Sequence, residues 1–239
     1  MPTNHHQGPG PSQARCIVTP ASAARGKRVR EPTKNFSGLF RGKFPSRKLG
    51  RMVHWESLLE RDAILLFEFS PRVATFREQP YSISYFHTGR MRRYTPDFEL
   101  TFRSGHTELV EVKPWVKLQK SDEQQRFEAI GSYFNARDMR FRILSDLEIR
   151  KRPLLDNLRL LYRCRTPQLS NGESRQLVEV LHRVKTPVFE EAVRTLGSEQ
   201  AFWQLVELGI IAVNLTEQIC NTTRYTLNLE GIDDETIYF

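Results

Sequence analysis

Residues 92–115, RRYTPDFELTFRSGHTELVEVKPW, contain two runs in which apolar and polar residues alternate, separated by Ser104 and Gly105. This alternation is typical of β-strands with one buried face, and the glycine between the runs favours a hairpin turn. Three charged side chains, Asp97, Glu111 and Lys113, lie among the apolar residues. Because strands rarely bury charge without a partner, the question is whether these three face one another.

The apolar residues of the two runs predict the register of this hairpin. Pairing Phe98 with Val112 and Leu100 with Val110 places both apolar rows on one face of the sheet. The same register leaves residues 104–106 as a three-residue loop with a glycine available for a positive φ. A shift by one residue would divide the apolar rows between two faces.

This register predicts a cluster of charge on the opposite face. Asp97 is expected opposite Lys113, with Glu111 two residues along the same face. Two carboxylates and an amine suit metal-assisted cleavage of a phosphodiester, because Mg²⁺ binds through carboxylate oxygens and a lysine can stabilise charge on the phosphate. The alternative is a simple cross-strand ion pair between Asp97 and Lys113.

A helix is predicted over residues 52–69, from apolar residues at helical spacing that end before Pro71. Glu60 is expected at the edge of its buried face, as a further acid for the cluster. Glu56, one turn earlier, and Asp62 remain alternatives, and any of the three could instead be an ordinary exposed charge.

The remaining pattern predicts three parts. Residues 1–48 are predicted to form a flexible basic arm, and residues 49–150 an α/β core. In this core a helix is predicted from Ser121, where Gln124 completes a capping box. The predicted strands are at 73–79, 81–87, 94–102, 107–114 and 139–145. Residues 151–239 read as four helical segments followed by two short strands, a mostly helical, winged-helix-like domain.

Charge is divided unequally along the chain. Residues 1–53 carry a net charge of +10, residues 54–165 carry +4, and residues 166–239 carry −6. Basic segments attract nucleic acid and acidic segments repel it. We therefore expect the N-terminal segment to contact nucleic acid and the C-terminal segment to contact protein. The residues expected to hold DNA phosphates are Lys43, Arg47, Lys48, Arg90, Arg92 and Arg93.

Several classes of protein are disfavoured by the sequence. It has no apolar run of about 18 residues, so we expect no membrane span, and its first residues lack the apolar core of a signal peptide. Cys16, Cys164 and Cys220 match no metal-binding or redox spacing, which indicates free thiols in a reducing cytoplasm.

Four short sequence motifs resemble those of the TnsA endonuclease subunits of heteromeric, TnsABC-type transposases, which belong to the PD-(D/E)XK nuclease superfamily. They are SLLERD at 57–62, FREQP at 76–80, RYTPDFEL at 93–100 and LVEVKP at 109–114. The resemblance covers about residues 45–145 and implies a restriction-endonuclease-like core in a bacterial cytoplasmic protein. It implies that Glu60, Asp97, Glu111 and Lys113 are catalytic, and that the three acids bind one or two Mg²⁺ ions, with Mn²⁺ as a substitute.

The resemblance also implies partners. TnsA-like proteins cut the 5′ strands at transposon ends, while the DDE-family transposase TnsB cuts the 3′ strands and the AAA+ regulator TnsC docks on the C-terminal domain. Two other hypotheses are a stand-alone restriction- or resolvase-like DNA endonuclease, which would cut DNA without partners, and a non-catalytic DNA-binding assembly factor. The last predicts that Asp97→Ala leaves transposition intact.

Overall fold

The computed structural model describes residues 40–165 and 169–228. Most of the predicted basic arm, residues 1–39, lies outside this part of the chain. None of the helices in the described part combines the length and apolar composition that a bilayer crossing needs.

A four-stranded mixed sheet forms the centre of the α/β part. Its strands are β3 (Val73–Glu78), β6 (Phe98–Phe102), β7 (Thr107–Val112) and β8 (Arg140–Leu144), in that spatial order. The β3–β6 and β6–β7 pairs are antiparallel, whereas β7 and β8 are parallel. The mixed α/β class predicted from the sequence is therefore confirmed.

The sheet is covered by one helix on each face. Val110 and Val112 of β7 pack in the cluster that contains α1 (Leu58–Phe69), whereas Leu109 packs in the cluster that contains α3 (Ser121–Asn135). Successive residues of a strand point to opposite faces, and both faces of β7 are buried. Its sequence is therefore mostly apolar at consecutive positions, as expected for a strand buried on both sides. This arrangement places Glu111 on the α3 face, between two core valines.

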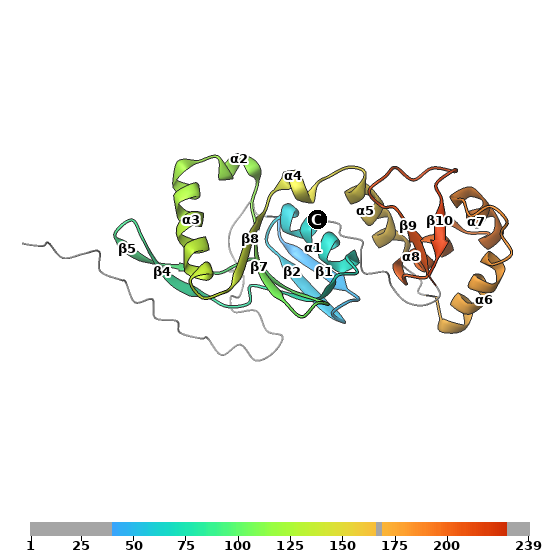
Figure 1. The fold of residues 1–239 in the computed structure, drawn as a ribbon, viewed down its shortest axis with the longest axis horizontal. Helices are drawn as coiled ribbons and strands as arrows, with labels where there is room; N and C mark the ends of the chain where they lie inside the picture. The colour runs from blue at the N-terminus through green and yellow to red at the C-terminus, as the bar shows by residue number, and fades with distance from the viewer. Residues whose placement is uncertain (1–39, 166–168, 229–239) are drawn as a thin grey trace, which may run out of the picture.

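Two small sheets and two short helices complete the α/β part. Strand β1 (Gly42–Ser46) pairs with β2 (Arg51–Trp55), and β4 (Ile83–His87) pairs with β5 (Arg90–Tyr94). The short helices are α2 (Trp115–Leu118) and α4 (Asp146–Ile149). Figure 1 shows the β4–β5 hairpin projecting at the end of the molecule opposite α6 and α7.

The C-terminal part consists of helices followed by a small sheet. They are α5 (Leu154–Cys164), α6 (Asn171–Leu181), α7 (Phe189–Leu196), α8 (Glu199–Glu207), β9 (Ile211–Val213) and β10 (Tyr225–Leu227). Strands β9 and β10 are antiparallel, and an isolated bridge joins Val188 to Arg224. These are the elements that the sequence predicts here, and the winged-helix-like classification stays a prediction.

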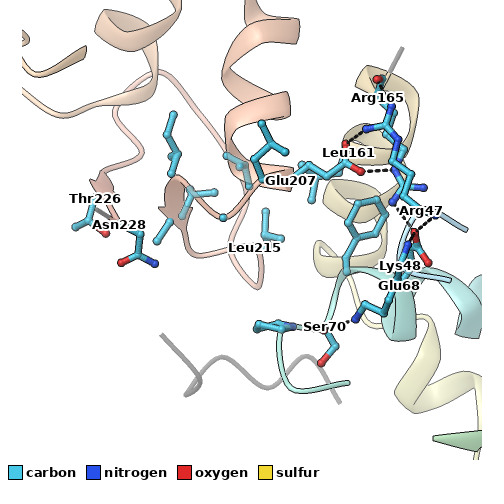
Figure 2. Close-up of a pocket in the computed structure, with 18 of the residues that line it drawn as sticks. Arg47, Lys48, Glu68, Ser70, Leu161, Arg165, Glu207, Leu215, Thr226 and Asn228 are labelled. Carbon is cyan, nitrogen blue, oxygen red and sulfur yellow. Dashed lines mark hydrogen bonds and ion pairs between the residues drawn. The ribbon is translucent and has the colours of Figure 1, made fainter. Parts of the chain in front are cut away.

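Buried ion pairs join the two parts. Arg165 lies 2.8 Å from Glu68 and 2.7 Å from Glu207, and Glu207 also pairs with Arg47 at 2.8 Å. These residues border a pocket of about 460 Å³ between α1 and the α8–β9 region (Figure 2). Asp62 is fully buried and pairs with Arg61, Arg150 and Arg159.

This junction engages two of the basic residues that were predicted to hold DNA phosphates. Arg47 is ion-paired with Glu207, and Lys48 Nζ donates hydrogen bonds to the carbonyls of Phe67, Ser70 and Val73 at 2.6–2.8 Å. The Lys48 ammonium is therefore occupied by backbone carbonyls of the protein, whereas Arg47 stays exposed while it pairs with Glu207. Asp62 likewise serves the junction and not the predicted acid cluster.

Several predicted boundaries also differ. Residues 51–55 form β2 and not the start of a helix, because Ser57 caps α1 by accepting a hydrogen bond from the Glu60 amide at 3.1 Å. Strand β1 lies inside the segment predicted to be a flexible arm. The strand predicted over 94–102 is interrupted at Pro96 and Asp97, and Ser121 makes no side-chain cap at the start of α3.

Candidate active site

Asp97 follows Pro96 in the short segment that leads from β5 into β6. Its backbone carbonyl accepts a hydrogen bond from the Gln79 amide at 2.8 Å, and its Oδ2 accepts one from the Val112 amide, also at 2.8 Å. The end of β3 therefore holds the Asp97 backbone and the end of β7 holds its carboxylate, so the position of Asp97 depends on the central sheet.

The register of β6 and β7 differs from the predicted one by two residues. Phe98 pairs with Val110 and not with Val112. The loop spans residues 103–105, because the Phe102 amide donates to the His106 carbonyl at 2.9 Å and Gly105 has a φ of 86°. A left-handed glycine at the third position of a three-residue loop is a common hairpin solution.

The corrected register moves Asp97 away from Lys113. Continuing the ladder from the Phe98–Val110 pair brings Asp97 level with Glu111. A shift by two residues keeps every side chain on its predicted face. The convergence of Asp97, Glu111 and Lys113 is therefore retained, while the predicted Asp97–Lys113 pair is wrong.

Glu111 is 6% exposed and is held by two neighbours. Tyr94 donates a hydrogen bond to its Oε2 at 2.9 Å, and Lys113 Nζ lies 3.8 Å from its Oε1. Lys113 is closer still to Glu123 of α3, whose Oε2 lies 3.4 Å from Nζ. The lysine thus lies between an acid of the sheet and an acid of the covering helix.

Glu60 lies close to this cluster but faces its own helix end. Its Oε2 accepts a hydrogen bond from the Glu56 amide at 2.8 Å. The Glu56 side chain accepts a hydrogen bond from Gln79 Nε2 at 3.2 Å. The charge of Glu60 still acts on Asp97 and Glu111, so the structure brings all three predicted acids into one electrostatic neighbourhood.

Burial makes the two sheet carboxylates costly to ionise. The carboxyl of Asp97 is surrounded by protein, which raises its pKa well above the usual value, and the charges of Glu111 and Glu60 raise it further. Burial likewise raises the pKa of Glu111 to about 7, although the Tyr94 hydroxyl and the Lys113 ammonium oppose the shift. Perturbed acids of this kind are concentrated at functional sites.

These carboxylates fit a divalent cation. The buried Glu111 and the half-buried Asp97 carry charges that repel each other, and one positive ion would stabilise both. Mg²⁺ commonly uses one or two protein carboxylates and completes its coordination with water and substrate oxygens. In the described part of the chain, no group of three or more His, Cys, Asp or Glu side chains is arranged to hold a metal. The role of Asp97 and Glu111 as cation ligands stays a prediction.

Gln79 is a residue of this site that the sequence pattern did not indicate. It is 8% exposed, its φ of 45° is unusual for a residue other than glycine, and its buried Oε1 has no hydrogen-bond partner within the protein. Its backbone contacts Asp97 and its side chain contacts Glu56. Strained backbone beside an acid cluster is typical of functional sites.

Four of the predicted DNA-binding residues are exposed on two strands of the structure. Arg90, Arg92 and Arg93 are exposed on β5, and Lys43 is exposed on β1. Arg92 and Arg93 border a pocket of about 500 Å³ that Glu123 also lines. This pocket therefore connects the basic hairpin with the residue that contacts Lys113.

Comparison with known families finds one match to the segment that contains most of these residues. Residues 70–146 match the family described as TnsA-like endonuclease N terminal. Asp97, Glu111 and Lys113 lie inside the matched segment, whereas Glu60 precedes it. No curated protein matches the chain. Residues 70–146 of the chain are therefore similar to the N-terminal endonuclease domain of TnsA-like proteins.

Proposed function

We propose that this protein is the endonuclease subunit of a heteromeric transposase and hydrolyses the 5′-strand phosphodiester at transposon ends. The observation that carries the proposal is that Asp97, just before β6, accepts a hydrogen bond from the Val112 amide of β7, the residue between Glu111 and Lys113, whose Nζ lies 3.8 Å from Glu111. This set lies within the matched endonuclease segment.

Each residue has a distinct proposed role. Asp97 and Glu111 hold a Mg²⁺ ion, for which Mn²⁺ can substitute, and Glu60 adds negative charge nearby. The bound cation supplies Lewis-acid activation of the phosphate and lowers the pKa of a water molecule. Lys113 orients the attacking water and stabilises the charge that builds on the phosphate oxygens.

The charge distribution supports different partners at the two ends of the molecule. The exposed arginines of β5 suit transposon-end DNA, whereas residues 166–239 carry a net charge of −6 and are disfavoured as a DNA surface. We assign the C-terminal part to protein contacts, with the AAA+ regulator TnsC as its partner and the DDE transposase TnsB acting beside the nuclease site.

Strand-resolved cleavage of a labelled transposon-end duplex in Mg²⁺ tests this function. The protein and its Asp97→Asn variant are compared with and without TnsB and TnsC. We expect 5′-strand cuts that require the partners and disappear in the variant. Cutting by the protein alone would indicate a stand-alone endonuclease, and DNA binding without cutting under every condition would indicate an assembly factor.

A further inference from the structure

The β4–β5 hairpin presents two large apolar side chains to solvent. Phe86 and Met91 are cross-strand partners and are 53% and 58% exposed. The two-residue turn between the strands, Thr88 and Gly89, has positive φ values of 48° and 74°, as the tightest hairpins require. This pair therefore stands on a stiff two-stranded ribbon.

The other face of the hairpin is fixed to the core. Ile83 and Tyr85 are 2% and 3% exposed and pack in the cluster that contains α3, with Tyr94 at the base of the ribbon. Because side chains alternate along each strand, Phe86 and Met91 must point away from that cluster. Their exposure follows from the register and is not a consequence of a loose loop.

The charges around the apolar pair are of one sign. Residues 81–96 contain three arginines and no carboxylate. Arg90, Arg92 and Arg93 are exposed, and within the described residues none of them forms an ion pair with an acid. Because side chains alternate along β5, Arg93 shares the face of Met91, whereas Arg90 and Arg92 lie on the opposite face. A partner that suits this ribbon must therefore offer apolar area to one face and negative charge along both edges.

We infer that the β4–β5 hairpin engages the duplex beside the cleavage site, with Phe86 and Met91 pressed against a base step from the minor groove and the arginines on the flanking phosphates. Duplex DNA presents stacked bases between two rows of phosphate, and proteins that deform it use apolar wedges flanked by arginine. The inference rests on the proposed function and adds a residue-level contact to it.

The geometry also predicts where along the DNA the contact falls. Tyr94 contacts Glu111, and Met91 lies three residues farther along the same strand. Three residues of strand span about 10 Å, which corresponds to about three base pairs. We therefore expect a distorted base step about three base pairs from the scissile phosphate.

The test uses the full chain carrying Asp97→Asn, so that bound DNA stays intact, and transposon-end duplexes with 2-aminopurine placed two to five base pairs on either side of the cleavage position. Binding of this protein, with its hairpin unaltered, should raise the 2-aminopurine fluorescence at one base step. Adding Phe86→Ala and Met91→Ala should abolish that increase and weaken binding about ten-fold, with an unchanged salt dependence because no charge is removed.

Two controls separate the parts of this surface. Replacing the three arginines with Gln should lower the slope of log affinity against log salt concentration by about two to three. Leu147→Ala removes an apolar side chain of α4 that is also 58% exposed, and should leave binding and fluorescence unchanged.

Several outcomes would overturn the inference. Unchanged affinity and fluorescence in the Phe86/Met91 double variant would do so even if the wild-type protein cuts DNA, in which case the proposed function stands. Intact DNA binding with lost binding to the transposase would assign the hairpin to a protein contact. Absence of both cleavage and DNA binding by wild type, with its partners present, would refute the inference and the proposed function together.

Discussion

Among single residues, Tyr94 is the one that fixes the Glu111 carboxylate. Its hydroxyl donates to Oε2 at 2.9 Å within a buried aromatic cluster. Tyr94→Phe should slow cleavage about 10- to 100-fold, as loss of a residue that orients a metal ligand usually does, with DNA affinity little changed. Tyr81→Phe removes a hydroxyl that faces the Met139 sulfur instead, and should cut at the wild-type rate. Equal rates for both variants would contradict this role.

The same carboxylates predict a pH dependence. Burial raises the pKa of Glu111 to about 7 and that of Asp97 well above its usual value, so the folded metal-free protein binds protons that the unfolded chain has released. Folding stability from these groups should therefore fall as the pH rises from about 4.5 through 7. Mg²⁺ should raise the melting temperature more at pH 8 than at pH 6, because at low pH it competes with protons.

Thermal unfolding with and without EDTA measures this effect. The variant Asp97→Asn removes one of the repelling charges, so it should melt above wild type at pH 8 without metal and respond little to Mg²⁺. A Mg²⁺-induced shift that is independent of pH, or that survives in Asp97→Asn, would contradict the assignment of these acids as cation ligands.

At the scale of elements, the β6–β7 turn sets which charges meet. Gly105 has a φ of 86°, a conformation that costs an L-residue about 1–2 kcal/mol. Gly105→Ala should lower the free energy of unfolding by about that amount. Gly131→Ala is a matched control of opposite sign, because Gly131 lies within α3 with open space around its Cα, and alanine should stabilise the helix by about 0.5–1 kcal/mol. Urea unfolding of both variants separates these effects.

The hairpin also shows what a sequence pattern can determine. Apolar alternation fixed the parity of the register, and hence that Asp97, Glu111 and Lys113 share a face. It could not choose between registers that differ by two residues, because these bury the same rows. The position of the left-handed glycine within the loop made that choice. The start of α1 was missed for a related reason, since short apolar runs suit both strands and helices.

Other parts of the site depend on tertiary structure alone. Tyr94 reaches Glu111 from a separate two-stranded sheet, and Glu123 reaches Lys113 from a helix that covers the main sheet. Gln79 approaches Asp97 because β3 ends beside the start of β6. Each of these residues has an ordinary local pattern, so only the assembled fold reveals its contact.

At the scale of the whole molecule, Arg165 joins the C-terminal helices to the α/β part. Its guanidinium lies between Glu68 and Glu207, and the Glu68 side chain is fully buried. Arg165→Ala should destabilise the protein by about 3–5 kcal/mol, because it leaves a buried carboxylate without its cation. Arg163→Ala, on an exposed position of the same helix, should change stability by less than about 0.5 kcal/mol. Similar melting temperatures for the two variants would refute this role.

The same junction shows what segment charge leaves open about two basic residues. Arg47 and Lys48 belong to the basic N-terminal segment. The Arg47 amide donates to Glu68 and its guanidinium pairs with Glu207, whereas the Lys48 ammonium donates to backbone carbonyls. Net charge describes a segment and not the partners of each side chain. Figure 1 shows β5, which carries the exposed arginines, at the end of the molecule opposite α6 and α7 of the C-terminal part.

The central claim is that Asp97 and Glu111 together hold a divalent cation, and Mn²⁺ binding followed by electron paramagnetic resonance at pH 7.5 tests it most directly. Wild type should bind Mn²⁺ that Mg²⁺ displaces, and Asp97→Asn should lose that binding while remaining folded. Asp62→Asn alters a fully buried aspartate that pairs with arginines instead, and should bind as wild type does. Equal Mn²⁺ affinity in wild type and Asp97→Asn would contradict the account.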